Sequence, residues 1–320
     1  MRARAARLIE HGQPLAVEEI DLPDPADGEL VVEMAYAAVN PVDRYQVLGR
    51  VAADAPLPRT LGSEGAGIVR SQGTDDGRRV FVNRASVVRP SDGTWASRVL
   101  VSRDKVIEVP EKVGLDVSAA IGVAGVTALR CVTELAAVTA DDQVLVLGAS
   151  GGVGSVIVGL AHRIGAYVVG QTGSEAKAGF VTERGADRVV VTDAAQLVAE
   201  LGSWQPSVVF DPLGDGFTTA GIEALSARGR LVLFGTSADP SGTLPLQALY
   251  RKGLKVLGYA GLLESEERVA EGGRLCLAAL QDGRMEIVIG SVLSLDEVDV
   301  ALDRFASREV QGKQLLDLHA

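Results

Sequence analysis

Short runs in which apolar and polar residues alternate fill the first third of the chain. They span residues 15–22, 29–36, 66–70, 79–83, 95–101 and 105–109. Turn-forming residues separate these runs, among them Pro23-Asp24-Pro25, Asp27-Gly28 and Asp92-Gly93. Alternation over so few residues is typical of strands with one buried face. The pattern therefore predicts a β-rich unit, either a small barrel or a sandwich.

From residue 117 the pattern changes. The stretch 117–134 is rich in Ala, Val and Leu and is expected to be helical. Apolar runs at 143–147, 167–170, 188–192, 207–211, 230–235 and 254–259 then alternate with helical stretches at 152–164, 174–183, 194–201 and 217–227. This alternation predicts an α/β unit of the Rossmann type, a doubly wound parallel sheet. An amphipathic stretch at 264–280 is expected to close it.

The end of the chain returns to the first pattern. Residues 288–293 and 313–317 have strand character on either side of a predicted helix at 295–307. We expect them to fold back onto the β-rich unit. The predicted domains are therefore residues 1–116 together with 288–320, and residues 117–287.

The sharpest local motif joins the first predicted parallel strand to the helix that follows it. The motif contains Gly148, Ser150, Gly151, Gly152, Val153 and Gly154. Glycines three residues apart let the backbone turn tightly, approach a pyrophosphate and pack the helix against the strand. The helix N-terminus attracts the phosphate charge. A purely structural turn is the alternative, but strand, turn, helix and second strand follow in the order that predicts a dinucleotide site.

The residues after the second parallel strand bear on which nucleotide binds. NAD sites usually place an acidic residue about twenty residues beyond the turn, where it accepts hydrogen bonds from the ribose. Here the strand runs into Gly173 and Ser174, no carboxylate stands at its tip, and Lys177 follows within one turn. A hydroxyl, a helix N-terminus and an ammonium favour a 2′-phosphate, and hence NADP(H). Glu175 lies close by and leaves NAD(H) open.

Composition excludes several other classes of function. The 320 residues carry 31 Lys and Arg against 42 Asp and Glu, a net charge of −11, so no dense cationic face for nucleic acid or an anionic membrane is expected. No segment is long and apolar enough for a membrane span, and the Arg-rich start does not resemble a signal peptide. We expect a soluble cytoplasmic protein with neither nucleic acid nor membrane as a partner.

The few histidines and cysteines give no candidate metal site. The chain has 3 His and 2 Cys, and we find no set of three ligands such as a catalytic zinc needs. Without a Lewis acid, the alkoxide that forms as hydride leaves an alcohol has little to stabilise it. Hydride addition to an enone or quinone spreads the charge into an enolate or hydroquinone anion, which a few hydrogen bonds can hold. The composition therefore favours reduction of an activated double bond.

Further segments spread along the chain form a specific combination. They are Pro23–Val32, Ala38–Tyr45 with its Asn-Pro-Val-Asp sequence, Leu61–Gly67, Gly125–Ala128, Phe234–Thr236 and Gln311–Lys313. Together with the glycine turn, they resemble the medium-chain dehydrogenase/reductase superfamily, in its zinc-independent quinone oxidoreductase (zeta-crystallin-like) branch. The resemblance runs nearly from end to end. Ser63 stands where the zinc-dependent relatives carry a ligand histidine.

The resemblance implies a GroES-like β-rich domain, a Rossmann NADP(H)-binding domain and an active site between them. By resemblance, the residues beside the coenzyme include Thr127, Phe234, Gly235, Thr236 and Lys313. Dimers of this family often pair the last sheet strand, here 254–259, so a homodimer is expected.

Three positions depart from tyrosines that are common in the branch: Thr192, Val51 and Trp95. Thr192 takes the place of a tyrosine near the adenosine 2′-phosphate, which weakens the argument for NADP(H). Val51 replaces a second tyrosine and predicts a more apolar substrate pocket.

The candidate catalytic residues are Asn40, Asp43 and Tyr45. Asn40 is expected to orient a carboxamide or substrate carbonyl, and Asp43 to hold a water or a backbone turn; ordinary turn chemistry is the alternative for both, and the favoured one for Asp43. Tyr45 is the candidate hydrogen-bond and proton donor to the substrate oxygen, with a packing role as its alternative.

We therefore expect an NADPH-dependent oxidoreductase that transfers hydride to a small-molecule quinone or α,β-unsaturated carbonyl compound. The alternatives are an enoyl reductase that acts on an acyl or polyketide-type chain, and a nucleotide-binding protein without turnover.

Overall fold

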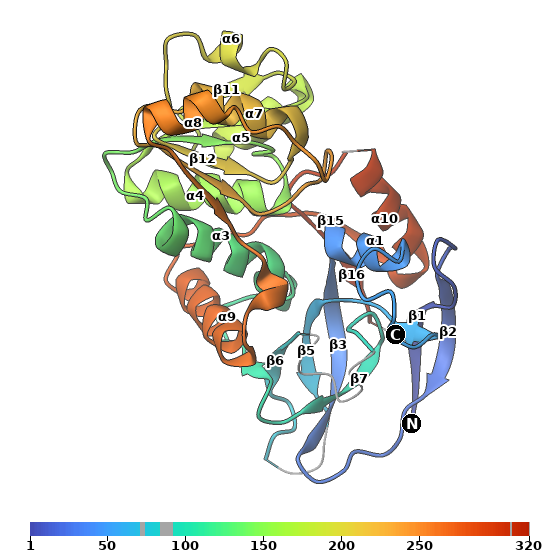
Figure 1. Ribbon diagram of the computed structural model, residues 1–320. Helices are drawn as coiled ribbons and strands as arrows, with labels where there is room; N and C mark the ends of the chain where they lie inside the picture. The colour runs from blue at the N-terminus through green and yellow to red at the C-terminus, as the bar shows by residue number, and fades with distance from the viewer. Residues whose placement is uncertain (71–73, 84–91, 308, 320) are drawn as a thin grey trace. The chain divides into compact units, whose positions relative to one another are not determined.

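Residues 1–70, 74–83, 92–307 and 309–319 are described by the computed structural model, in which the chain divides into two units (Figure 1). Unit 1 consists of Met1–Val123, Ser265–Asp282 and Ile287–Ala320. Unit 2 consists of Ala124–Glu264 and Gly283–Glu286.

Unit 1 contains two sheets. The smaller has the strand order β2-β1-β4, and the larger has the order β15-β16-β3-β5-β6-β8, with β7 paired to β3. The strands are β1 Arg2–Leu8, β2 Ala16–Asp21, β3 Glu29–Val39, β4 Arg59–Thr60, β5 Glu64–Val69, β6 Arg79–Asn83, β7 Arg98–Ser102, β8 Ile107–Glu108, β15 Ile289–Ser294 and β16 Lys313–Asp317. The helices are α1 Pro41–Val47, α2 Leu115–Ser118, α9 Glu266–Gln281 and α10 Val298–Ala306.

The predicted return of the chain end is seen within unit 1. Strand β16 pairs antiparallel with β3, and β15 pairs parallel with β16. Strand β1 was not among the predicted strands, although its sequence carries the signal. Arg2 and Arg4 are exposed while Ala3 and Ala5 are buried, so Arg and Ala alternate with the period of a strand.

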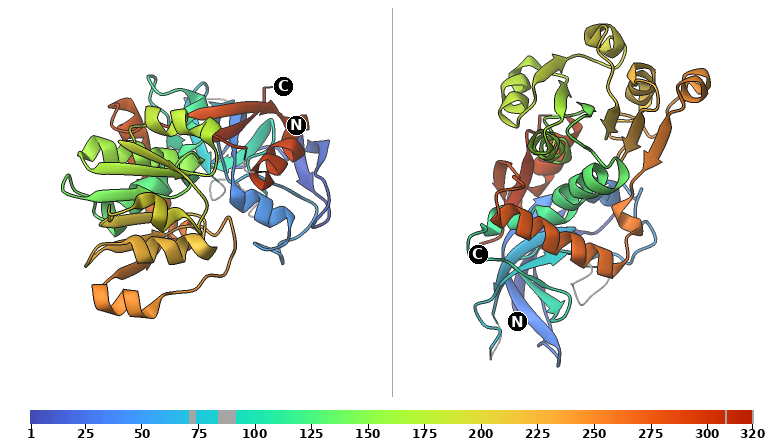
Figure 2. Two further views of the ribbon diagram at one scale, coloured as in Figure 1. Left: turned by 90° about the horizontal axis from the view of Figure 1, so that it is seen from above. Right: turned by 90° about the vertical axis from the view of Figure 1, so that its left-hand side faces the viewer.

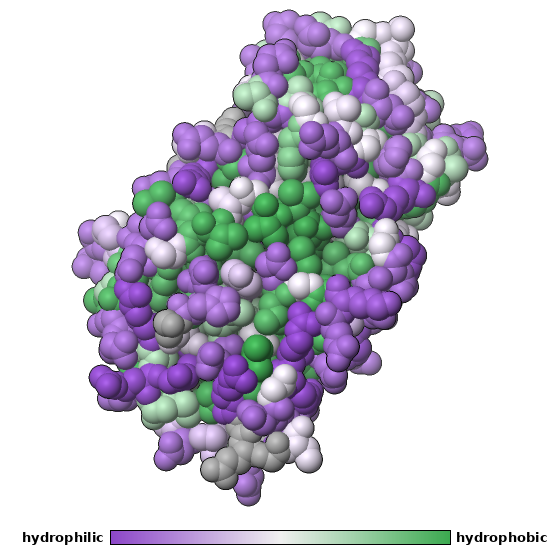
Figure 3. Space-filling view, turned by 180° about the vertical axis from the view of Figure 1, so that it is seen from behind, coloured by the Kyte–Doolittle hydropathy of each residue, from purple (hydrophilic) through white to green (hydrophobic). Residues whose placement is uncertain are grey.

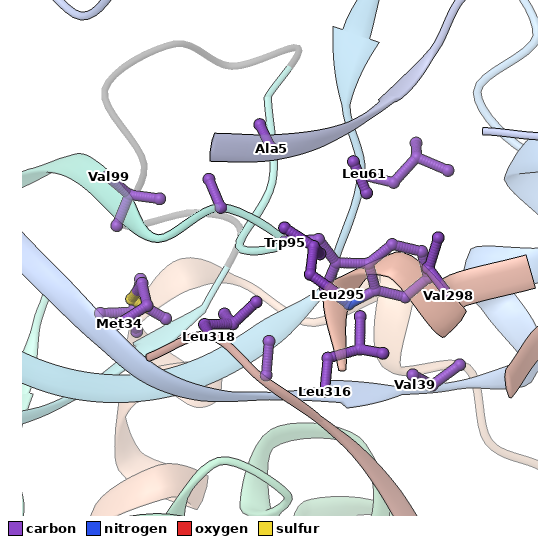
Figure 4. Close-up of a cluster of buried hydrophobic side chains, with 14 of the residues drawn as sticks. Ala5, Met34, Val39, Leu61, Trp95, Val99, Leu295, Val298, Leu316 and Leu318 are labelled. Carbon is purple, nitrogen blue, oxygen red and sulfur yellow. The ribbon is translucent and has the colours of Figure 1, made fainter. Parts of the chain in front are cut away.

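Trp95 lies at the centre of the unit 1 core (Figure 4). Its side chain is fully buried, and its indole Nε1 donates to the Ala38 carbonyl at 3.0 Å. Around it pack residues from β1, β3, β16 and α10, including Ala5, Val39, Leu316 and Val298. This core packs the end of β3, after which α1 begins, against β16 near the end of the chain.

Unit 2 is built on one parallel sheet of 6 strands in the order β11-β10-β9-β12-β13-β14. The strands are β9 Gln143–Val146, β10 Tyr167–Thr172, β11 Arg188–Val191, β12 Val208–Asp211, β13 Arg230–Leu233 and β14 Lys255–Gly258. Numbered in chain order, the strands follow the order 3-2-1-4-5-6 of dinucleotide-binding folds. Successive strands are added on one side of β9 up to β11 and on its other side from β12 onward.

Helices lie on both faces of this sheet, as the two views of Figure 2 show. They are α3 Val126–Arg130, α4 Gly152–Ile164, α5 Ala178–Glu183, α6 Leu197–Leu201, α7 Asp215–Ala224 and α8 Leu246–Lys252. Leu145, Val169 and Val209 pack with residues of α6 and α7 in one core cluster. Their strand neighbours point to the opposite face, where α4 packs on β9 and β10. The predicted α/β fold, with a β-rich domain and a Rossmann sheet, is confirmed.

Helix α9 is predicted in its position along the chain but lies in a different unit from the one expected. The sequence places the amphipathic stretch within residues 117–287, whereas α9 belongs to unit 1 and contacts β8. Gly273 permits this contact, because a Cβ there would lie 2.6 Å from Cδ1 of Ile107. The chain then returns to unit 2 for Gly283–Glu286 before it enters unit 1 again.

On the face drawn in Figure 3, polar side chains cover most of the surface and apolar ones gather in patches between them. Within the described ranges, no helix has the length and apolar character required to cross a membrane.

Candidate functional site

The glycine turn of unit 2 joins β9 to α4 with very little space between strand and helix. Gly148 has a φ of +59°, the left-handed region that favours glycine. A Cβ on Gly154 would lie 2.4 Å from the Gly148 carbonyl oxygen, closer than any side chain tolerates. At Gly151 the same distance would be 3.3 Å. Gly154 is therefore the position at which the helix contacts the strand end most closely.

Helix α4 begins without a side-chain cap. Its N-cap is Gly151, which has no side chain to accept from the first-turn N–H groups. The N–H groups of Gly152, Val153 and Gly154 precede the first residues that can bond within the helix. Ser150 adds a hydroxyl that lies 3.5 Å from the Thr172 hydroxyl at the end of β10. Backbone N–H groups, a hydroxyl and the positive end of the helix dipole can together hold an anionic pyrophosphate.

Gln171, a residue outside every predicted motif, fixes the shape of the turn. Its Oε1 accepts from Gly148 N at 3.0 Å, and its Nε2 donates to the Thr192 carbonyl at 2.7 Å. Its own carbonyl accepts from Ala149 N at 2.9 Å. The side chain is 2% exposed, so these bonds form away from water. A buried amide in a strand that leads to a glycine turn is the signal that could have identified it.

The predicted adenosine-side residues follow β10. Ser174 is the N-cap of the short 3₁₀ helix Glu175–Lys177, and Lys177 N donates to the Ser174 carbonyl at 3.0 Å. A Cβ on Gly173 would meet nothing within 4 Å, so this position borders open space. Because β10 and β9 are parallel neighbours, Gly173, Ser174 and Lys177 lie at the same edge of the sheet as the glycine turn.

The ends of β12 and β13 form a second pair of turns at this edge. The buried Asp211 carboxylate accepts from Leu213 N at 2.8 Å, Gly214 N at 3.1 Å and the Thr218 hydroxyl at 2.6 Å. Burial raises the pKa of Asp211, and these three hydrogen bonds oppose the rise. The turn that Asp211 holds runs from Pro212 to Gly214.

The Pro212–Gly214 turn lies between the glycine turn and the end of β13. A Cβ on Gly148 would lie 3.2 Å from Pro212 Cγ, and one on Gly235 would lie 2.8 Å from the Pro212 carbonyl oxygen. The predicted Phe234, Gly235 and Thr236 are half-buried and follow β13 beside this turn. Thr127 is half-buried in α3, which packs on α4.

Unit 1 contains a buried polar network at the start of α1. Asn40, Asp43, Glu64 and Lys313 are between 0% and 4% exposed. The Lys313 ammonium donates to Asn40 Oδ1 and, at 3.2 Å, to Glu64 Oε1. The Asn40 side-chain amide donates to the same Glu64 oxygen at 3.0 Å. Val123 N donates to the other Glu64 oxygen at 3.0 Å, so each oxygen of this buried carboxylate has a partner.

Asp43 lies beside this network with a different set of partners. Its Oδ2 accepts from Asn40 N at 2.9 Å, and its Oδ1 accepts from the Ser63 hydroxyl at 2.6 Å. Burial raises the pKa of Asp43 to about 7. The bonds from Ser63 and Asn40 and the Lys313 charge oppose this rise, while the Glu64 charge adds to it. One ammonium thus stands close to two carboxyl groups.

The three candidate catalytic residues are not all brought together. Asn40 and Asp43 are joined by a hydrogen bond, whereas Tyr45 lies two residues further on, where a helix presents a different side. The half-buried Tyr45 phenol has no hydrogen-bond partner among the described residues. Lys313, predicted beside the coenzyme, lies in the Asn40–Glu64 network, to which no local sequence pattern points.

Across the described ranges, no group of three or more His, Cys, Asp or Glu residues is arranged to hold a metal ion. His11 Nδ1 contacts the Gln46 carbonyl at 3.1 Å, and His319 Nδ1 contacts Asp317 Oδ1 at 2.6 Å. Cys131 and Cys276 are both buried.

Two family models match the chain. The Alcohol dehydrogenase GroES-like domain matches residues 26–111, and the Zinc-binding dehydrogenase domain matches residues 152–272. The quinone oxidoreductase of Sus scrofa is 29% identical, and the alignment covers 98% of this chain and 97% of that protein.

Two solved structures are similar over the whole chain. The mycobacterial Rv1454c complexed with NADPH is 25% identical, with a TM-score of 0.83 over 98% of this chain and 99% of that one. A structure described as an NAD-dependent alcohol dehydrogenase is 26% identical, with a TM-score of 0.85 and the same coverage.

The Asp43 carboxyl predicts a specific dependence of stability on pH. The folded protein holds a proton on Asp43 up to pH of about 7, whereas the unfolded chain releases it near pH of about 4. Over this window the native state binds more protons, so the free energy of unfolding falls as pH rises. We expect the wild type to gain stability relative to Asp43→Asn as pH falls from about 7 to about 4.

Denaturant unfolding of both proteins across this range, followed by circular dichroism, measures the difference. Other titrating groups are common to both proteins and cancel in the comparison. A difference in unfolding free energy that does not change with pH would show that Asp43 keeps its ordinary pKa.

Proposed function

Because the chain belongs to the medium-chain dehydrogenase/reductase superfamily and its quinone oxidoreductase branch, we propose that it is an NADPH-dependent oxidoreductase. It transfers hydride to a quinone or to an α,β-unsaturated carbonyl compound. The observation that carries this proposal is the glycine turn that leads into the uncapped N-terminus of α4, at the point between β9 and β12 where the strand order reverses. The chain also aligns over 98% of its length with a quinone oxidoreductase.

The residues of unit 2 fit a dinucleotide. Gly151–Gly154 and Ser150 would hold the pyrophosphate, since Gly154 leaves no room for a side chain and α4 offers free N–H groups. Ser174 and Lys177 would hold the adenosine 2′-phosphate, and Gly173, which borders open space, would leave room for it. Thr127 and the turn Phe234–Thr236 would flank the nicotinamide. The bound coenzyme supplies the hydride.

The residues of unit 1 position and polarise the acceptor in this proposal. The Asn40 amide is fixed by Glu64 and Lys313, and one of its two Nδ2 hydrogens is left for a carbonyl oxygen. Fixed donors of this kind stabilise an enolate or hydroquinone anion without reorganisation. The Tyr45 phenol remains a candidate donor to the same oxygen. With 3 His, 2 Cys and Ser63 at the zinc-ligand position of relatives, the chain offers no recognisable set of zinc ligands.

A quinone assay tests the proposal. We expect the purified protein to oxidise NADPH in the presence of 9,10-phenanthrenequinone, to bind NADPH more tightly than NADH, and to move deuterium from labelled NADPH into an enone product. Tighter binding of NADPH follows from Ser174 and Lys177, because a hydroxyl and an ammonium interact with the 2′-phosphate.

Each other outcome identifies a different function. Activity with an enoyl thioester alone would favour the enoyl reductase. Tight NADPH binding without transfer to any quinone, enone or enal would favour a nucleotide-binding protein without turnover. Neither alternative is favoured by an observation on this chain.

We propose that the protein is a homodimer that pairs β14 with its copy across a two-fold axis. Strand β14 is an edge strand, and an unpaired edge is a ready template for another strand. Exposed apolar side chains lie on β14 and on the segments that precede and follow it in the chain: Leu244, Leu246, Tyr250, Val256, Leu262 and Leu263, which are between 37% and 86% exposed. Apolar groups of this kind around an unpaired edge are typical of an interface.

Sedimentation velocity tests the dimer. The wild type is expected at twice the mass of one chain, and Leu262→Asp/Leu263→Asp at the mass of one chain, because these side chains are 72% and 86% exposed and contribute little to the fold. Val300→Asp, at a 48% exposed position on α10 in unit 1, is the matched control and should stay dimeric. A wild type that sediments as one chain at all concentrations would contradict the proposed interface.

A further inference from the structure

The polar network at the start of α1 has one member that reaches the surface. Asn40, Asp43, Glu64 and Lys313 are buried, whereas Ser63 is half-buried. The Ser63 hydroxyl lies 2.6 Å from Asp43 Oδ1. Ser63 precedes β5 directly, and its neighbour Glu64 belongs to the same network, so the position of the hydroxyl is fixed from both sides.

The partners of Asp43 leave one route for a proton. Its Oδ2 is bound by the Asn40 backbone N–H, which does not exchange its proton in catalysis. Its Oδ1 is bound by the Ser63 hydroxyl, which can both donate and accept. A proton that enters or leaves this buried carboxyl along its hydrogen bonds therefore passes through Ser63.

The charges around Asp43 make a protonated state accessible. The Glu64 carboxylate accepts hydrogen bonds from the Lys313 ammonium, the Asn40 amide and the Val123 N–H, so its negative charge is compensated. Among the described residues Asp43 has no ion-pair partner, and its two hydrogen bonds come from neutral groups. A buried carboxyl so placed gains less from ionisation than an exposed one, in agreement with the raised pKa of Asp43.

Other titratable groups near α1 lie at its margins. Arg44 on α1 is half-buried, and His11 Nδ1 contacts the Gln46 carbonyl near the helix end. Helix α10, which packs against α1, carries Asp299, Asp303 and Arg304, all exposed or half-buried. The charged groups that act on Asp43 from within the network are Glu64 and Lys313.

We propose that Ser63 is the proton donor of the reduction and that Asp43 is the proton reservoir behind it. This rests on the proposed function, since it supplies the proton that accompanies the hydride. When Asp43 is protonated, its O–H donates to Ser63 Oγ, and the Ser63 hydroxyl turns outward to donate to the acceptor oxygen. Ser63 is then a catalytic residue, and Asp43 a positioning residue that acts through it.

The step balances in atoms and electrons. The hydride brings two electrons to the acceptor, the coenzyme is oxidised by two electrons, and a π-electron pair moves onto the acceptor oxygen. The Ser63 O–H bond breaks as a bond forms from that proton to the acceptor oxygen. The Asp43 O–H bond breaks as the Ser63 hydroxyl is restored. Asp43 is left as a carboxylate, and water returns its proton through Ser63.

The kinetics of five variants test this assignment, two of them in the proposed donor and its reservoir and three as controls. With NADPH and an enone, wild-type kcat should fall as pH rises through about 7, the range in which Asp43 loses its proton, and should show a solvent deuterium isotope effect. Ser63→Ala and Asp43→Asn should each lower kcat about 100-fold, which is the lower end of what general acid catalysis contributes. Both variants should also lose the pH dependence of kcat and the solvent isotope effect. Binding of NADPH should be unchanged in both.

The controls separate this role from a structural one. Ser118→Ala removes a buried unit 1 hydroxyl whose hydrogen bond, within the part of the chain that the structure describes, goes to the Gly114 carbonyl, and it should leave the pH profile intact. Ser63→Thr, which keeps the hydroxyl, should restore the pH dependence. Tyr45→Phe should lower kcat without removing the pH dependence; if it removes the pH dependence and Ser63→Ala does not, Tyr45 is the donor and the assignment to Ser63 is overturned.

The protonation state of Asp43 can be measured in the coenzyme-free protein by infrared spectroscopy, without turnover. Infrared difference spectra should show a protonated carboxylic acid at pH 6 that disappears in Asp43→Asn and shifts in Ser63→Ala. Absence of this band in the wild type would overturn the proposal. If the wild type transfers no deuteride to any acceptor, the proposed function fails; if it transfers deuteride and Ser63→Ala keeps the wild-type profile, only the assignment of Ser63 fails.

Discussion

Helix α4 begins so close to the end of β9 that no side chain fits between them. The constraint is steric: a Cβ on Gly154 would lie 2.4 Å from the Gly148 carbonyl oxygen. It places the uncapped N-terminus of the helix at the carboxyl edge of the parallel sheet, beside the point where the strand order reverses. Everything proposed for the coenzyme depends on this approach, because only a helix held there presents its N–H groups to a phosphate at the switch point.

The two units contribute different chemistry. Unit 2 contributes backbone: turns whose shapes are fixed by buried amide and carboxylate groups such as Gln171 and Asp211, each bonded to main-chain atoms of the turn beside it. Unit 1 contributes side chains, in a network where Lys313 compensates Glu64 and orients Asn40. Backbone donors suit a ligand that binds in every cycle, and a fixed polar network suits charge that develops during the reaction.

The sequence predicted those parts of the structure that depend on neighbouring residues. The glycine turn, the alternation of strands and helices in unit 2 and the short strands of unit 1 are local patterns, so they could be predicted from the sequence. The Lys313 network could not, because Lys313 is 273 positions from Asn40 and 249 from Glu64, and no local pattern links them. Strand β1 could have been predicted from its Arg and Ala alternation, whereas the assignment of α9 to unit 1 depends on a contact between Gly273 and Ile107.

The affinity of NADPH for Gly154→Ala, compared with Gly151→Ala, tests the central claim most directly. A methyl group at Gly154 must displace backbone, whereas at Gly151 it lies 3.3 Å from the nearest atom and needs only a small adjustment. Calorimetric titration should therefore find NADPH binding lost in Gly154→Ala, with the protein still folded by circular dichroism, and retained in Gly151→Ala with weaker affinity. Wild-type affinity in Gly154→Ala would contradict the account, because the coenzyme would then not depend on the approach of α4 to β9.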